Sequence, residues 1–167
     1  LTEGGTLSVA NSGATLQVND SFTLFSATTY SGEFAGISPA NPDSDPELAW
    51  DKPALKASGS LKVHHVPYAT NKTIVRTKGM SGKIRLSELF PSPDSKDGDT
   101  VALEGLPTTL GSGATISNNA TFLFYSQAND SNDSYDYTVS DGRGGKRTKK
   151  ITITYVAGTA SLLVALP

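Results

Sequence analysis

The chain has 167 residues with 14 basic and 16 acidic side chains, so its formal net charge is −2. This near balance argues against a nucleic-acid-binding protein, which normally carries a basic excess. The sequence contains no cysteine, which excludes a disulfide framework, a zinc-thiolate site and a cysteine nucleophile. It also contains no apolar run of about 18 residues, so we expect no membrane-spanning helix.

Short segments in which apolar and polar residues alternate fill the first third of the chain, and Gly, Ser, Asn or Asp separate them. Period-two alternation between turn residues predicts half-buried strands. We expect strands at residues 6–9, 15–18, 22–25, 32–37, 48–50 and 61–63. Residues 39–46 contain three prolines and predict a loop, because proline cannot lie inside a central strand.

A second series of strands is expected at residues 73–77, 83–86, 101–103, 114–117, 121–125, 135–140 and 149–156. The last two form a hairpin, because Gly142, Gly144 and Gly145 supply the backbone freedom that a tight turn needs. The fold class predicted is all-β, with two small antiparallel β-sandwich-like modules at 1–63 and 72–157. Residues 64–71 are expected to link them, since alternation is weak there and Pro67 interrupts it.

The last ten residues, 158–167, do not fit this scheme, because an almost unbroken apolar run follows the closing strand. A continuous run is typical of a strand buried on both faces. Three alternatives are open: an extra strand or linker stub, a strand given to a neighbouring subunit, or a short helix or cleaved sorting tail. If the strand is donated, the subunit-contact residues are Ser161, Leu162, Leu163, Val164, Ala165 and Leu166.

Two family resemblances rest on motifs in the two modules. The first module contains Gly4-Gly5-Thr6-Leu7-Ser8-Val9, Asn19-Asp20-Ser21-Phe22-Thr23-Leu24-Phe25, Tyr30-Ser31-Gly32-Glu33-Phe34, Leu48-Ala49-Trp50-Asp51 and Gly59-Ser60-Leu61-Lys62-Val63. Through these motifs it resembles the module that ends autotransporter-type β-repeat regions in large bacterial surface proteins.

The second module contains Ile84-Arg85-Leu86-Ser87-Glu88-Leu89-Phe90, Asp94-Ser95-Lys96-Asp97-Gly98-Asp99-Thr100 and Tyr135-Asp136-Tyr137-Thr138-Val139-Ser140-Asp141-Gly142-Arg143-Gly144-Gly145. Through these motifs, residues 72–156 resemble the cadherin-like, immunoglobulin-like tandem repeats of bacterial adhesins. The resemblance implies immunoglobulin-like β-sandwiches, supported by calcium, that act as extracellular spacers or adhesive stalks without catalytic activity.

The same resemblance implies a calcium site at Asp94, Asp97 and Asp99, with Asp141 approaching from the hairpin. Clustered carboxylates on a loop supply oxygen ligands of the kind that calcium prefers. The spacing lacks the order of a helix-loop-helix calcium site, and Pro91-Ser92 stand where the family commonly has an Asn-Asp pair. The alternative is an acidic turn facing solvent.

Other charged residues have simpler interpretations. His64 and His65 are adjacent, and neighbours in an extended segment point in opposite directions, so we interpret them as linker residues without a third metal ligand. The basic residues of the last turn and of the segment that follows it are interpreted as solvated charges that protect an edge strand, the alternative being binding to an acidic polysaccharide or to a neighbour's carboxylates. They are Arg143, Lys146, Arg147, Lys149 and Lys150.

We therefore expect a secreted, extracellular structural or adhesive subunit of a bacterial surface assembly, not an enzyme. Its expected partners are identical subunits or neighbouring surface-protein modules, and strand donation would join them into a filament. The alternative is a carbohydrate-binding accessory module of a secreted polysaccharide-degrading protein. Tyr30, Trp50 and Tyr68 are the candidate sugar platforms, although Trp50 is better interpreted as a core residue.

Overall fold

The chain forms two compact units. The computed structural model describes residues 1–77, 80–93, 96–127 and 129–157. Unit 1 comprises Leu1–Ala69, Phe90–Glu104 and Thr138–Thr148, and unit 2 comprises Thr70–Leu89, Gly105–Tyr137 and Lys149–Pro167. The predicted tail at 158–167, with Ser161 to Leu166, lies outside the described residues. The predicted module boundaries, with the linker at 64–71, stay a prediction.

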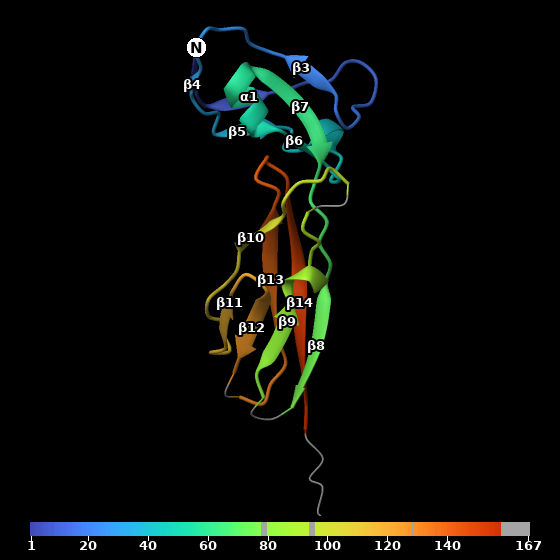
Figure 1. Cartoon of the computed structure of the whole chain (residues 1–167), viewed down its shortest axis with the longest axis vertical. Coiled ribbons are helices and arrows are strands. Elements are labelled where there is room, and N and C mark those ends of the chain that lie inside the picture. The colour runs from blue at the N-terminus through green and yellow to red at the C-terminus, as the bar shows by residue number, and fades with distance from the viewer. Residues whose placement is uncertain (78–79, 94–95, 128, 158–167) are drawn as a thin grey trace, which may run out of the picture. The chain divides into compact units, whose positions relative to one another are not determined.

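Strands dominate the described residues, which confirms the all-β prediction (Figure 1). No helix in these residues is both long and apolar enough to cross a membrane. The strands are β1 (Thr2–Glu3), β2 (Thr6–Ser8), β3 (Ser21–Thr23), β4 (Ser31–Gly32), β5 (Gly36–Ser38), β6 (Leu48–Trp50), β7 (Ser60–His65), β8 (Lys72–Thr77), β9 (Gly82–Arg85), β10 (Ala102–Gly105), β11 (Thr115–Asn118), β12 (Phe122–Ser126), β13 (Asp133–Ser140) and β14 (Lys146–Val156). Two short 3-10 helices, Pro42–Ser44 and Leu86–Glu88, and one α-helix, α1 (Lys52–Ser58), complete the set.

The first 65 residues of unit 1 form three small sheets. β7 lies between β3 and β6 and pairs antiparallel with both. β1 pairs with β4, and β2 with β5, in parallel. Apolar residues of these strands, of α1 and of the segment before β3 meet in one core, which consists of Leu16, Ile37, Leu48, Trp50, Leu55, Leu61 and Val63.

Helix α1 was not predicted from the sequence, yet its ends carry recognised signals. The Asp51 side chain accepts a hydrogen bond from the backbone N–H of Ala54, which is the usual role of an N-cap residue. Pro53 lies in the first turn, and Gly59 ends the helix with φ of 67°, a left-handed conformation that glycine adopts without strain. Leu55 is the helix's single buried residue, so no apolar periodicity marked it.

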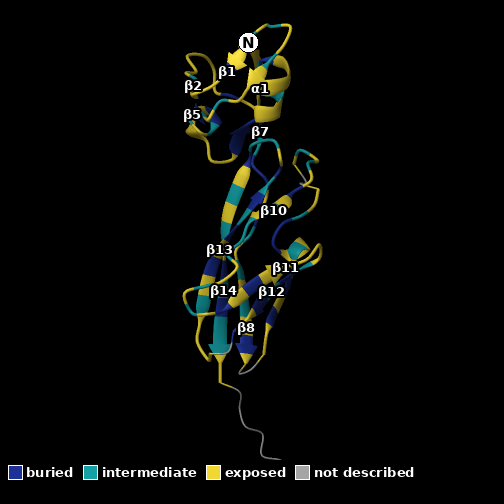
Figure 2. Cartoon of the chain, turned by 90° about the vertical axis from the view of Figure 1, so that its left-hand side faces the viewer, coloured by how far each residue is buried: buried dark blue, intermediate teal, exposed yellow. Residues whose placement is uncertain are grey.

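Strands β8 to β14 form a sandwich of two sheets. The three-stranded sheet has the order β11-β12-β9, and the four-stranded sheet has the order β10-β13-β14-β8. Buried and exposed residues alternate along β13 and β14, as the bands of colour in Figure 2 show. Tyr135, Tyr137 and Val139 are buried, and so are Ile151 and Ile153, which confirms the predicted hairpin and its inward faces.

Two predicted strands of unit 1 were wrong in detail. Residues 15–18 form no strand, because the backbone turns there: Gln17 N–H donates to the Asp20 carboxylate, and Asp20 N–H donates to the Gln17 carbonyl. Residues 32–37 form the ends of two separate strands, β4 and β5, and not one. Leu16 is nevertheless buried in the core, as the alternation of apolar and polar residues at 15–18 predicted.

Candidate functional site

Three chain segments bring a group of charged side chains together within unit 1. The end of β7 contributes His64 and His65, the loop before β10 contributes Asp97 and Asp99, and the turn between β13 and β14 contributes Asp141 and Arg143. Asp51, the N-cap of α1, joins them. We call these seven residues the polar cluster.

Asp141 is fixed by the turn that it begins. One of its oxygens, Oδ1, accepts hydrogen bonds from the backbone N–H groups of Arg143, Gly144 and Gly145 at 2.8, 3.2 and 3.0 Å. Gly145 is required beside it, because a Cβ there would lie 2.2 Å from Asp141 Oδ2. Burial raises the pKa of Asp141, although the backbone hydrogen bonds and nearby His64 oppose the shift.

The second oxygen of Asp141 faces His64. Asp141 Oδ2 lies 3.4 Å from His64 Nδ1, and both side chains are almost fully buried. No hydrogen-bond partner in the described residues reaches Asp141 Oδ2 or either imidazole nitrogen of His64. Buried polar atoms normally have such partners, so these three atoms are candidates for contact with a ligand.

Asp97 is held by the residue next to His64. Its two oxygens contact the imidazole Nδ1 of His65 and the His65 backbone N–H, each at 2.7 Å. Burial alone would raise the pKa of Asp97, but the two hydrogen bonds from His65 outweigh it and lower the pKa. Asp97 is therefore an oriented, ionised carboxylate.

Arg143 joins two carboxylates that are distant in sequence. Its Nη1 contacts both oxygens of Asp99 at 3.1 and 3.0 Å, and its Nε and Nη2 contact Asp51 Oδ2 at 3.1 and 2.9 Å. Burial alone would lower the pKa of Arg143, but the hydrogen bonds to Asp51 and Asp99 outweigh it and raise the pKa. The guanidinium thus tethers the hairpin turn to the start of α1 and to the Asp99 loop.

The structure brings together three of the four residues expected to bind calcium. Asp97, Asp99 and Asp141 belong to the polar cluster, while Asp94 lies outside the described residues. A ligand atom of His64 and one oxygen each of Asp97 and Asp99 lie within 4.8 Å of one another. The calcium site itself stays a prediction.

The structure places the two histidines, which were interpreted as linker residues, at the end of strand β7. His64 is a buried residue of β7 with 1% exposure, and His65 contacts Asp97. No sequence spacing indicated this, because their carboxylate neighbours come from segments more than 30 residues away. The alternation of β7 gave no signal either, because it places His64 on the same face as the exposed Lys62.

A comparison of the sequence with protein-family models agrees with the β-sandwich formed by β8 to β14. A family model described as a bacterial Ig domain matches residues 64–154, more than half of the 167-residue chain. The chain belongs to the bacterial Ig domain family. No curated protein matches it. The bacterial Ig domain confirms the immunoglobulin-like part of the predicted resemblance, while the autotransporter-type resemblance of residues 1–63 stays a prediction.

The bacterial Ig domain begins at His64, so His64, Asp97, Asp99, Asp141 and Arg143 of the polar cluster all belong to it. Asp51 precedes the matched segment. The family match therefore covers the residues that were predicted to bind metal, but it assigns no ligand to them.

The interpretation of the basic residues as protecting a strand edge stays a prediction. β14 lies between β13 and β8 in its sheet, but β8 pairs only with its residues from Ile151 to Val156, and the basic residues precede this ladder. Arg147 contacts both carboxylate oxygens of Glu47 at 2.9 Å and donates to the Pro67 carbonyl at 2.8 Å. Lys146 lies 2.6 Å from Glu104 and Lys150 lies 3.5 Å from Asp136. These lysines therefore form ion pairs within the chain.

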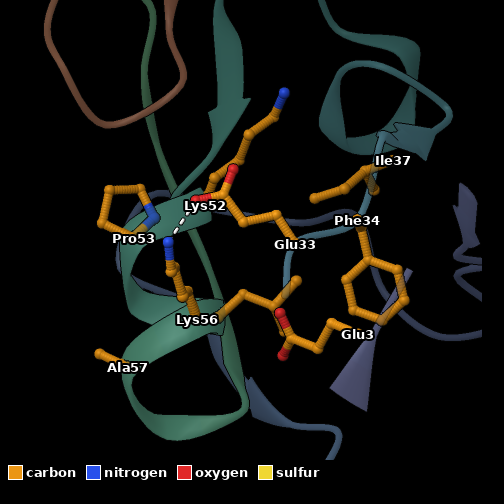
Figure 3. A pocket seen from close by; sticks show the side chains of 9 residues that line it. Glu3, Glu33, Phe34, Ile37, Lys52, Pro53, Lys56 and Ala57 are labelled. Carbon is orange, nitrogen blue, oxygen red and sulfur yellow. Dashed lines mark hydrogen bonds and ion pairs between the residues drawn. The ribbon is translucent and has the colours of Figure 1, made fainter. Parts of the chain in front are cut away.

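A groove of about 540 Å³ lies outside the matched Ig segment, between α1 and the strands of the first 37 residues (Figure 3). Phe34, Ile37 and Leu55 form its apolar part, and the ion pair of Lys56 with Glu33 lies beside it. Glu3 is buried there, and no hydrogen-bond partner in the described residues reaches its Oε1.

Trp50, a predicted sugar platform or core residue, is buried with 3% exposure and is a core residue.

Proposed function

We propose that the chain is an extracellular structural module of a bacterial surface assembly, in which the bacterial Ig domain acts as a spacer that resists tension. The observation that carries this proposal is the parallel pairing of the first and last strands of unit 2. β8 and β14 are paired over six residue pairs, from Lys72 with Ile151 to Thr77 with Val156.

The direction of this pair determines how it responds to force. In a parallel pair, the chain enters β8 at one end of the ladder and leaves β14 at the other end. Tension along the chain therefore pulls the two strands past each other, and every hydrogen bond of the ladder is loaded together. In a hairpin pulled at its open end, by contrast, the bonds break one after another.

A surface module must also meet its neighbours, and one face of the β8–β14 pair is suited to this. Successive strand residues alternate between faces, so Val75 and Val156 share a face with threonines of both strands. Val75 is 65% exposed and Val156 is 41% exposed. In this proposal a neighbouring copy or surface module covers this β-branched face, which consists of Thr73, Val75, Thr77, Thr152, Thr154 and Val156.

The finer proposal is that neighbouring copies form a filament by strand donation from Ser161 to Leu166. This part rests on the apolar sequence run, which lies outside the described residues. β8 and β10 are the outer strands of the four-stranded sheet in the part of the chain that the structure describes. An outer strand has an unpaired edge to which another chain can add a strand.

Electron microscopy of the purified full chain tests assembly, and deletion of residues 158–167 tests strand donation. We expect fibres from the full chain and monomers of unchanged stability from the truncated chain. Fibres that persist after truncation would remove the donated strand from the proposal. Single-molecule pulling tests the spacer role separately: rupture of the Ig domain at forces no higher than those of a simple hairpin would contradict it.

A second candidate function, binding of a polysaccharide, is supported by the groove beside α1. A sugar needs an apolar surface for its ring face and polar groups for its hydroxyls, and Phe34 and Glu3 supply these. Glycan-array binding by the full chain, lost in a Phe34→Ala variant, would support this function. Binding that is unchanged in that variant would exclude the groove.

A further inference from the structure

The polar cluster is short of positive charge. Four carboxyl groups, Asp51, Asp97, Asp99 and Asp141, lie in it together with one permanent cation, Arg143, so acidic groups outnumber the fixed positive charge. All of these residues belong to unit 1. Burying unbalanced charge is expensive, and a divalent cation bound among the carboxylates would reduce the imbalance.

A second, independent observation points to a ligand at one place in this cluster. His64 is buried, and among the residues that the structure describes neither of its ring nitrogens finds a hydrogen-bond partner. The Oδ2 atom of Asp141 is likewise buried with no hydrogen-bond partner in the described part of the chain, and it lies 3.4 Å from His64 Nδ1. Two ligand atoms on one zinc ion stand roughly 3.3 Å apart, because each bond is about 2 Å long and the angle is tetrahedral.

The donor set identifies the class of metal. Calcium takes roughly six to eight oxygen ligands and seldom a nitrogen. Here an imidazole nitrogen lies among the carboxylates, and Arg143 already occupies both oxygens of Asp99 on one side. A set of one imidazole and two or three carboxylate oxygens fits a small divalent transition ion such as Zn²⁺ better than it fits Ca²⁺.

The surrounding groups hold these donors in place. His65 binds Asp97 through its ring and its backbone, Arg143 binds Asp99, and three backbone amides bind Asp141 Oδ1 and leave Oδ2 available. Metal sites commonly have such supporting hydrogen bonds, which orient the ligands before the ion arrives. The donor atoms of His64, Asp97 and Asp99 lie within 4.8 Å of one another, so small side-chain rotations would close the shell.

We propose that His64, Asp97, Asp99 and Asp141 form a binding site for one divalent transition-metal ion of the Zn²⁺ class, in place of the calcium that the family resemblance implied. The site does not depend on the proposed spacer role. Its effect is to fasten the loop before β10 and the β13–β14 turn to β7, because each of the three segments contributes a ligand.

The test is calorimetric titration of the full chain with Zn²⁺ and, separately, with Ca²⁺. We expect one Zn²⁺ per chain, thermal stabilisation by Zn²⁺, and no comparable effect of Ca²⁺ at the same concentration. Ca²⁺ binding that matches or exceeds Zn²⁺ binding, or Zn²⁺ binding without a defined stoichiometry, would overturn the proposal.

Two further measurements assign the residues. His64→Gln and Asp97→Asn should each weaken Zn²⁺ binding by at least about tenfold. Asp136→Asn is the matched control, because Asp136 is an exposed carboxylate paired with Lys150 in unit 2, and it should leave the affinity unchanged. Equal affinity in His64→Gln and the control would refute the assignment.

Because a substitution at a buried histidine can unfold the chain, the unmodified protein provides the independent measurement. It contains two histidines, so their ring signals can be followed by nuclear magnetic resonance during titration. One equivalent of Zn²⁺ should shift the ring nitrogen signals of His64 more than those of His65. Unmoved His64 signals at saturation would contradict the proposal.

Discussion

Arg143 and Asp51 are 92 positions apart in the sequence, and two hydrogen bonds of 3.1 and 2.9 Å join them. Arg143 also binds Asp99, so one side chain of the β13–β14 turn holds two other segments of unit 1. Side-chain exposure is 33% for Arg143, 10% for Asp51 and 17% for Asp99, so water screens these contacts only in part.

Replacing Arg143 with methionine should therefore lower the free energy of unfolding by about 2 kcal/mol, because it leaves two poorly solvated carboxylates without their cation. Urea denaturation monitored by tryptophan fluorescence measures this, since Trp50 is the single tryptophan. Lys146→Met is the control: its pair with Glu104 is largely exposed and should contribute less than about 1 kcal/mol. Equal losses in the two variants would show that Arg143 does not tie unit 1 together.

Asp51 has two separable roles, which two substitutions distinguish. Its Oδ1 caps α1 through the Ala54 N–H, and its Oδ2 binds Arg143. Asparagine is a good helix N-cap but lacks the charge, whereas alanine loses both functions. We expect Asp51→Ala to be less stable than Asp51→Asn by about 1 kcal/mol in urea denaturation. If the two variants are equally stable, the cap contributes nothing and the ion pair accounts for the whole effect.

Tyr135 and Tyr137 lie on the same face of β13 and are both buried, but their hydroxyls differ. The Tyr137 hydroxyl lies 2.6 Å from the Thr70 carbonyl oxygen and 3.1 Å from that of Leu89, whereas the Tyr135 hydroxyl has no partner in the described residues. Tyr137→Phe should cost about 1–2 kcal/mol of stability, because it also leaves a carbonyl without its donor. Tyr135→Phe should be neutral or slightly stabilising, and a loss equal to that of Tyr137→Phe would contradict this account.

Local patterns in the sequence were sufficient to predict much of the fold. The strand at 48–50 agrees with β6, and the alternating tyrosines and isoleucines identified the inward faces of β13 and β14. These features depend on residues that are neighbours along one strand. Gly142 and Gly144 of the predicted turn have positive φ values, 75° and 124°, as the hairpin required.

The polar cluster could be predicted only in part, because its geometry depends on long-range contacts. The acidic residues were recognised by their density, but nothing local indicated that His64 would face Asp141, 77 positions later, or that Arg143 would reach Asp51. The parallel pairing of β14 with β8 was likewise not predicted, because the residue pattern within each strand does not indicate which distant strand it pairs with. Helix α1 was missed although its cap residues were present, because one buried residue gives no periodicity.

The tyrosines also predict how stability depends on alkaline pH. Burial, together with the hydrogen bond and negative charge of Asp133, raises the pKa of Tyr125 to about 12, although nearby Arg76 opposes the shift. Burial likewise raises the pKa of Tyr135. In the unfolded chain a tyrosine ionises near pH 10, so between about pH 10 and 12 the unfolded state releases a proton that the folded state retains. Stability is therefore complete below about pH 10 and falls as the pH rises toward 12.

For Tyr125 this decline should amount to about 2 kcal/mol between pH 10 and 12. Urea denaturation at a series of alkaline pH values measures it, and the ultraviolet absorbance of tyrosinate follows ionisation in the folded protein. Lysines also titrate in this range, so the wild type is compared with Tyr125→Phe, in which the decline should be shallower. If all six tyrosines of the folded chain ionise together near pH 10, the Tyr125 hydroxyl is not buried against Asp133 as the structure places it.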